Sequence, residues 1–226
     1  MASPLPSLRL AQPGEMRTDR KEALRYLGYG KAIPDEVVLE LMDSCEEELL
    51  AACQPRACWL PVPVSFPAPH TVDLGFGPVG SVSLAKHLEG CHSALLFAAT
   101  LGVGADRLVA RWSRLRPSRS AVLDALASAA IECWCDDVEV EITRNEAKHC
   151  ERFSPGYGDF ALEHQKDFLR LLDMGRLLGV SLTDTLLMNP SKSVTAVIGL
   201  GASARTCGHK CMFCDKKNCI YREVIL

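Results

Sequence analysis

The sequence lacks a long apolar segment. Its most apolar stretch, residues 94–105, is short and is interrupted by Gly102 and Gly104, whereas a membrane-spanning helix needs about 20 consecutive apolar residues. The N-terminal residues also lack a basic segment followed by an apolar one, which is the pattern of a secretory signal. We therefore expect a cytoplasmic protein with no membrane partner.

An excess of basic charge is also missing. The chain of 226 residues has 25 Lys and Arg against 28 Asp and Glu, which gives a formal net charge of -3. Proteins whose main partner is nucleic acid usually neutralise phosphates with a basic face, so we expect no nucleic-acid partner. A hydrophobic content of 48% suffices for one sizeable globular core, and the sequence has no internal repeat.

Disulfide bonds are not expected, although the chain has 11 cysteines, because cytoplasmic thiols are kept reduced. Seven of the cysteines are scattered along the chain, and we interpret them as small buried apolar residues. These seven are Cys45, Cys53, Cys58, Cys91, Cys133, Cys135 and Cys150.

The other four cysteines form a candidate metal site near the C-terminus: Cys207, Cys211, Cys214 and Cys219. Their spacing lets four thiolates converge on one centre, and both zinc and a [4Fe-4S] cluster accept four thiolates. We favour the iron–sulfur cluster because the run from Cys207 to Cys214 resembles cluster-binding loops. The six histidines show no paired ligand spacing, so we interpret them as solvent-facing or capping residues, with His209 as an alternative ligand of the cysteine site.

Helical and strand patterns are mixed without a regular alternation of strand and helix, which favours an α+β fold. The carboxylates of 46–48 and 136–141 are interpreted as solvated faces or ends of helices. Asp19 and Glu22 form a capping-box pattern that opens the first helix. The patterns predict helices near 19–28, 34–53, 81–89, 105–115, 120–136 and 162–178, and strands near 58–66, 72–76, 92–101, 183–188 and 194–200. Prolines at 61 and 63 place the first of these strands at a sheet edge.

The segment Arg152-Phe153-Ser154-Pro155-Gly156-Tyr157-Gly158-Asp159 has the residues of a ligand-binding turn. A Pro-Gly pair cannot continue a helix or a central strand, so the backbone turns and stays open there. An arginine suits a carboxylate because its fork donates two parallel hydrogen bonds. On local chemistry alone, a plain surface turn is the favoured interpretation of this segment.

This segment resembles the Arg-Pro-Ala-Pro-Gly-Tyr motif of the activation domain of cobalamin-dependent methionine synthase. The resemblance continues in order along the chain between about Lys21 and Arg205. Before the motif, the family's strand resembles residues 98–102 and its buried helix resembles 123–130. After the motif, the family's next helix resembles 168–173, its following turn resembles 179–183, and its Met-Trp-Pro hairpin resembles 188–194. Thr206 stands where the family has a tyrosine that closes on the ligand.

The resemblance implies a twisted, mainly antiparallel sheet with several long helices and a shallow site for S-adenosylmethionine. By it, Arg152 takes the carboxylate of the ligand, the backbone of Phe153 and Ser154 holds the amino-acid and adenosine parts, and Pro155, Gly156 and Tyr157 shape the wall. The sulfonium activates its own methyl group and cobalamin on a partner accepts it, so the resemblance implies no catalytic acid, base or nucleophile.

We thus expect three parts: a flexible N-terminus over 1–18, an activation-domain-like domain over 19–205 and a four-cysteine tail over 206–226. The expected function is that of a reactivation subunit, which binds S-adenosylmethionine for the reductive remethylation of cob(II)alamin on a methionine synthase core. The electron donor would be flavodoxin or ferredoxin. The alternative is an iron–sulfur or zinc-binding adaptor that activates another corrinoid protein without S-adenosylmethionine, and a zinc-stabilised interaction module is a third possibility.

Overall fold

The computed structural model describes residues 5–30 and 32–201. Its helices are α1 (Arg20–Tyr26), α2 (Glu36–Ala52), α3 (Val82–His87), α4 (Val103–Leu115), α5 (Pro117–Thr143), the short 3-10 helix η1 (Leu162–His164), α6 (Gln165–Leu171) and α7 (Met174–Leu177). Its strands are β1 (Ser7–Leu10), β2 (Arg56–Pro63), β3 (Ser65–Ala68), β4 (Thr71–Asp73), β5 (Pro78–Gly80), β6 (Ser93–Thr100), β7 (Ser181–Leu182), β8 (Met188–Asn189) and β9 (Ser193–Leu200).

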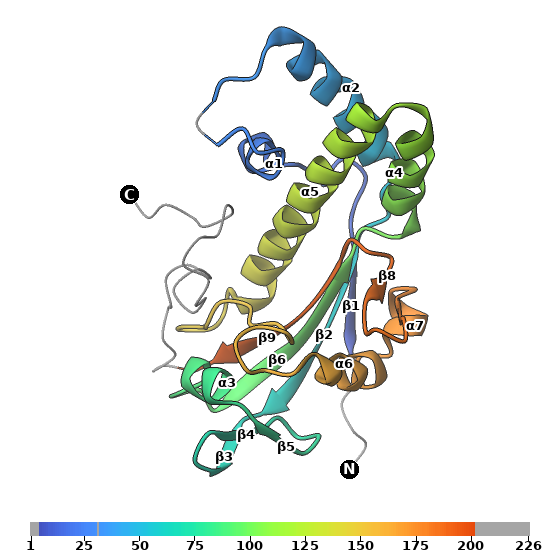
Figure 1. Cartoon of the computed structure of the whole chain (residues 1–226). Helices are drawn as coiled ribbons and strands as arrows, with labels where there is room; N and C mark the ends of the chain where they lie inside the picture. Colours follow the sequence, from blue (N-terminus) through green and yellow to red (C-terminus); the bar gives the residue numbers. More distant parts are fainter. Residues whose placement is uncertain (1–4, 31, 202–226) are drawn as a thin grey trace.

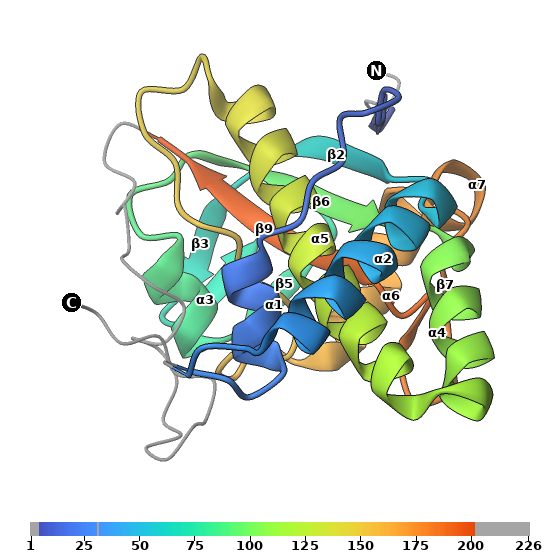
Figure 2. The same cartoon turned by 90° about the horizontal axis from the view of Figure 1, so that it is seen from above.

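A four-stranded antiparallel sheet with the strand order β1-β2-β6-β9 lies at the centre (Figure 1). Side chains of the central strand β6 alternate between two hydrophobic clusters, as strand geometry requires. Leu95 and Phe97 pack with the helices α1, α2, α4 and α5, which Figure 2 shows in front of the sheet. Leu96 and Ala98 pack on the other face with α3, α6, α7 and the two small sheets. The predicted α+β class with a mainly antiparallel sheet is confirmed.

The central helix α5 is longer than the sequence pattern predicts. Pro117 opens it, because the first helical turn tolerates a missing N–H. The helix has buried residues on most of its faces, with Leu126 and Trp134 among them. It continues beyond Asp136 to Thr143. The interpretation of 136–141 as a solvated helix face holds for Asp136 and Glu141, which are exposed, and is wrong for Glu139, whose side chain is only 12% exposed.

The prediction of a flexible N-terminus over 1–18 is wrong for part of that range. Residues Ser7–Leu10 form the edge strand β1, which pairs antiparallel with β2 from Trp59 to Arg56. A segment of four residues is too short to show the alternating hydrophobic pattern of a strand. The backbone pairing with β2 holds these residues in a strand. Pro61 and Pro63 lie beyond Trp59, where β1 no longer covers β2, and there the predicted edge position holds.

Two further predictions near the C-terminal half are wrong in detail. The predicted helix over 162–178 is broken into η1, α6 and α7, and Asp173 separates the last two with a left-handed backbone (φ 47°). The predicted strand over 183–188 is mostly a loop, in which the Thr183 hydroxyl accepts a hydrogen bond from the N–H of Leu187. The strand predicted over 194–200 is confirmed as β9.

The seven scattered cysteines are free thiols, and six of them are fully buried, which confirms their interpretation as small apolar residues. Burial raises the pKa of Cys53 and of Cys58 to about 12, so these two stay protonated. Within residues 5–30 and 32–201 the structure has no cluster of His, Cys, Asp and Glu able to hold a metal. The predicted ligands Cys207, Cys211, Cys214 and Cys219 lie outside the described residues. No described helix is long and apolar enough to cross a membrane.

Candidate functional site

The segment that carries the motif runs beside β9. The N–H of Cys150 donates to the carbonyl of Gly199 at 2.8 Å, and Phe153 and Val197 exchange two N–H···O bonds of 2.9 Å. Because neighbouring residues of an extended chain point to opposite sides, Phe153 enters the core while Arg152 turns toward α5. The Phe153 ring stacks on His87 with 4.7 Å between ring centroids.

The backbone of Phe153 is paired within the protein. Its N–H and its carbonyl are both bonded to Val197, so the N–H has no hydrogen bond left for a ligand. The part of the motif that faces the solvent begins at Ser154. Sequence reasoning missed this because the pairing of 150–153 with β9 joins segments far apart in the chain.

Arg152 is held by three carboxylates on one face of α5. Its Nη2 donates to Glu132 at 3.1 Å and to Asp136 at 2.6 Å, and its Nη1 donates to Glu139. Positions 132, 136 and 139 follow the helical repeat, which explains how one guanidinium reaches all of them. The arginine side chain is only 5% exposed, so most of its surface is covered by the protein.

Burial and charge oppose each other in this cluster. Burial disfavours the charge of Arg152, but the negative groups around it, with Glu139 and Asp136 among them, outweigh that effect and raise the pKa of Arg152. Burial raises the pKa of the Glu139 carboxyl, and the positive charge of Arg152 opposes the rise. Glu132 and Asp136 are more exposed, at 34% and 61%.

The turn after Arg152 is fixed at both ends. The N–H of Tyr157 donates to Ser154 at 3.0 Å and that of Gly156 to Phe160 at 2.7 Å, with Gly156 at a left-handed φ of 95° that suits glycine. Asp159 then accepts hydrogen bonds from the Ser81 hydroxyl and from two backbone N–H groups at the start of α3. The Ser81 bond contributes most to lowering the pKa of Asp159. The turn is thereby anchored to α3.

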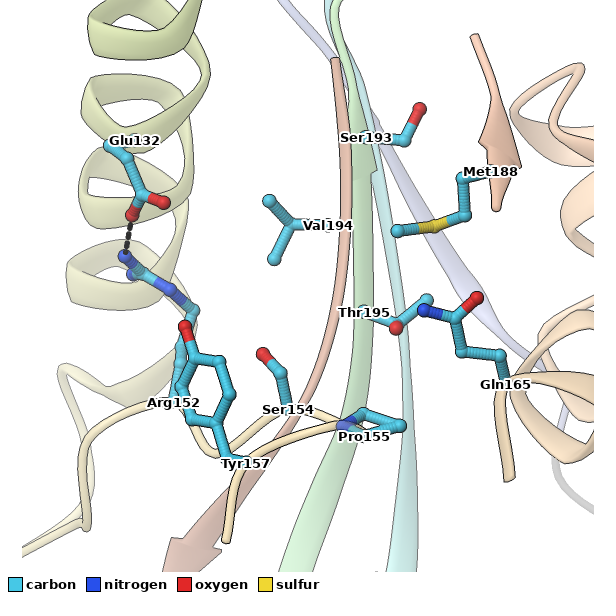
Figure 3. A pocket seen from close by; sticks show the side chains of 10 residues that line it. All are labelled: Glu132, Arg152, Ser154, Pro155, Tyr157, Gln165, Met188, Ser193, Val194 and Thr195. Carbon is cyan, nitrogen blue, oxygen red and sulfur yellow. Dashed lines mark hydrogen bonds and ion pairs between the residues drawn. The ribbon is translucent and has the colours of Figure 1, made fainter. Parts of the chain in front are cut away.

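Two neighbouring cavities lie beside this turn. A groove of about 780 Å³ runs between α1, α5 and the motif segment, and a smaller pocket of about 160 Å³, drawn in Figure 3, lies between the motif, α6 and β9. Glu132, Arg152 and Tyr157 belong to the linings of both. The groove is acidic, because its lining has six carboxylates against two guanidinium groups: Asp19, Glu22, Glu132, Asp136, Glu139 and Glu151 against Arg25 and Arg152.

Comparison with known proteins identifies the fold. No family model matches the sequence, and a search of curated proteins gives no match. Among solved structures, the crystal structure of the MetH reactivation domain bound to AdoHcy matches with a TM-score of 0.66 at 14% sequence identity. The similarity covers 88% of this chain and 79% of that chain. The chain has the fold of the MetH reactivation domain.

Most of the predicted site residues come together in this reactivation-domain fold. Arg152, Ser154, Pro155 and Tyr157 line the small pocket, whereas Phe153 lies in the core beside it. Sequence reasoning missed Glu132, Asp136 and Glu139, whose spacing on a helix was the available signal. It gave no site role to Met188 and the start of β9, which it recognised only as part of a hairpin, and it missed Gln165, for which the sequence gives no local signal; these residues complete the pocket.

Proposed function

We propose that the protein binds S-adenosylmethionine in the acidic groove and acts as a reactivation subunit for a cobalamin-dependent methionine synthase. The observation that carries this proposal is the cluster of Arg152 with three carboxylates at the junction of the two cavities. The reactivation-domain fold supports it, because the similar MetH domain was solved with AdoHcy bound.

The charges of the groove fit the proposed ligand. S-adenosylmethionine carries a sulfonium and an ammonium group against one carboxylate, so its net charge is positive. Glu132 and Asp136 present carboxylate oxygens to the groove for these cationic groups. Arg152 donates three of its five N–H groups to carboxylates, and one of the other two would bind the carboxylate of the ligand, as the resemblance implies.

The residues of this chain bind and orient the ligand. S-adenosylmethionine supplies an activated methyl group for cobalamin on the partner. Arg152 holds Glu132 and Asp136 in place, Asp159 anchors the turn, and Tyr157, which is 41% exposed, stands at the mouth. Holding the methyl donor in one orientation for the docked partner is the contribution that the protein makes to the rate.

We also propose that Cys207, Cys211, Cys214 and Cys219 hold a metal centre near the ligand. A [4Fe-4S] cluster there could pass the single electron that reduces cob(II)alamin, in relay with flavodoxin or ferredoxin. Zinc would only fix the tail, since it has no accessible redox change. The spacing of the four cysteines supports a shared centre, and their proximity to Ser193–Leu200 in sequence favours a position beside the site.

A reactivation assay tests the function. The protein is purified without oxygen, and its iron, sulfide and zinc are measured. It is then mixed with a synthase core that lacks an activation domain and holds cob(II)alamin. A reductant and methyl-labelled S-adenosylmethionine complete the assay. We expect labelled methylcobalamin and restored turnover. Asp136→Asn should lower the rate of methyl transfer about tenfold, because it removes one charge-assisted contact. The control is Asp137→Asn, which changes a neighbouring carboxylate that pairs with Arg17 outside the groove. This control variant should keep the wild-type rate.

Two outcomes of this assay would contradict the proposal. Absence of methyl transfer, together with absence of S-adenosylmethionine binding in metal-loaded protein, would favour the adaptor of another corrinoid protein. Stoichiometric zinc without iron or sulfide would remove the electron-transfer role and leave the ligand site in place.

A further inference from the structure

The carboxamide of Gln165 is a buried polar group that faces the small pocket. Gln165 is the first residue of α6 and is only 7% exposed. Its Oε1 has no hydrogen-bond partner among the described residues. Figure 3 shows the side chain extending from α6 toward β9, next to Thr195 and Met188. Buried polar atoms in folded proteins are nearly always paired, so this one points to a partner outside the part of the chain that the structure describes, and a bound ligand is such a partner.

The walls of the pocket suit a flat ring. Pro155, Met188 and Val194 offer apolar surface around the carboxamide, and the hydroxyls of Ser154 and Thr195 stand at their edges (Figure 3). The volume is about 160 Å³, and an apolar cavity of about 150 Å³ is known to accept a benzene ring. A single planar ring system with polar atoms on one edge matches this shape.

The pocket adjoins the acidic groove, with which it shares the lining residues Glu132, Arg152 and Tyr157. A ligand with a flat ring in the pocket can therefore reach the groove with its charged end. A carboxamide offers one acceptor and one donor side by side, and this pair matches the amino group and the adjacent ring nitrogen of adenine. Guanine lacks an amino group at that place, and pyrimidines are smaller.

We propose that Gln165 is the residue that selects adenine, by accepting a hydrogen bond from the 6-amino group and donating one to a ring nitrogen. The inference rests on the proposed function, since it assigns the adenosyl part of S-adenosylmethionine to the pocket and the amino-acid part to the groove. Gln165 is a specificity residue and takes no part in methyl transfer.

The binding of two analogues of S-adenosylmethionine, both with an uncharged sulfur atom, tests this assignment. S-adenosylhomocysteine and its analogue without the 6-amino group are titrated into wild-type protein, Gln165→Leu and the exposed control Gln54→Leu. Wild type and Gln54→Leu should prefer the adenosyl compound by about 10- to 100-fold. Gln165→Leu should bind both compounds with the weaker affinity. Its melting temperature should not fall, because the variant removes a buried oxygen that has no partner in the described structure.

The outcomes separate this inference from the proposed function. Full preference for the adenosyl compound in Gln165→Leu would overturn the role of Gln165 while the function stands. Lack of binding of either compound, and of S-adenosylmethionine, to wild type would overturn the function itself. A lower melting temperature with unchanged preference would make Gln165 a folding residue. If Gln165→Leu does not fold, the unbranched Gln165→Met takes its place.

Discussion

Replacing Arg152 by leucine is expected to destabilise the protein by about 3–5 kcal/mol, the usual cost of leaving a buried charge without its partner. The guanidinium is buried against Glu139, whose side chain is only 12% exposed, and the variant leaves that carboxyl in the protein interior. Urea denaturation of the variant and the wild type measures the difference. The same variant should lose S-adenosylmethionine binding, since Glu132 and Asp136 lose the group that orients them.

A double variant controls for the loss of charge. Arg152→Leu combined with Glu139→Leu removes both members of the buried pair, and apolar replacement of a whole pair is often neutral. The double variant should therefore recover most of the stability without recovering binding. Equal stability of the single variant and the wild type would mean that the pair is solvated, which would contradict the geometry described above.

Replacing Gly104 by alanine is expected to destabilise the protein by about 2–3 kcal/mol, as overpacking typically does. A Cβ atom on Gly104 would lie 2.0 Å from the carbonyl oxygen of Ala52 at the end of α2. The backbone carbonyl of Ala52 cannot rotate away from the new Cβ atom as the end of a flexible side chain could. The helix α4 therefore has to shift away from α2. The helix propensity of alanine offsets about 1 kcal/mol of this cost.

Gly80→Ala is the matched control for Gly104→Ala. A Cβ at Gly80 meets no atom within 4 Å, and the residue has no left-handed backbone. Thermal unfolding should place Gly80→Ala close to the wild type and Gly104→Ala well below it. A Gly104→Ala protein as stable as the control would show that the contact between α2 and α4 is loose.

The sequence predicts those parts of the fold that local chemistry determines. The capping side chain of Asp19 and the positions of α2, β6 and β9 follow from residues within each element. β1 does not, because its four residues are held by β2. The break at Asp173 also escapes prediction, since a left-handed aspartate leaves the hydrophobic spacing of 162–178 unchanged.

The residues of the candidate site also divide into those that the local sequence reveals and those that depend on contacts between distant segments. The motif residues Arg152 to Tyr157 are recognisable in the sequence, and the turn that the Pro-Gly pair predicts is present, closed by the hydrogen bond from the N–H of Tyr157 to the carbonyl of Ser154. The burial of Glu139 is not recognisable, because an acidic run on a helix end is usually solvated and only the pairing of 150–153 with β9 brings Arg152 against it. Gln165 belongs to a segment whose pattern predicts only a helix, so its role depends on the three-dimensional packing.

The affinity of the purified protein for S-adenosylmethionine, compared with that for S-adenosylhomocysteine, tests the central claim most directly. The two ligands differ in the methyl group and its sulfonium charge, and the groove has six carboxylates against two guanidinium groups. Titration calorimetry should show S-adenosylmethionine binding about tenfold more tightly, a difference of about 1.4 kcal/mol, and salt should reduce that difference. Lack of binding of both ligands at millimolar concentration, or equal affinity at every salt concentration, would contradict the account.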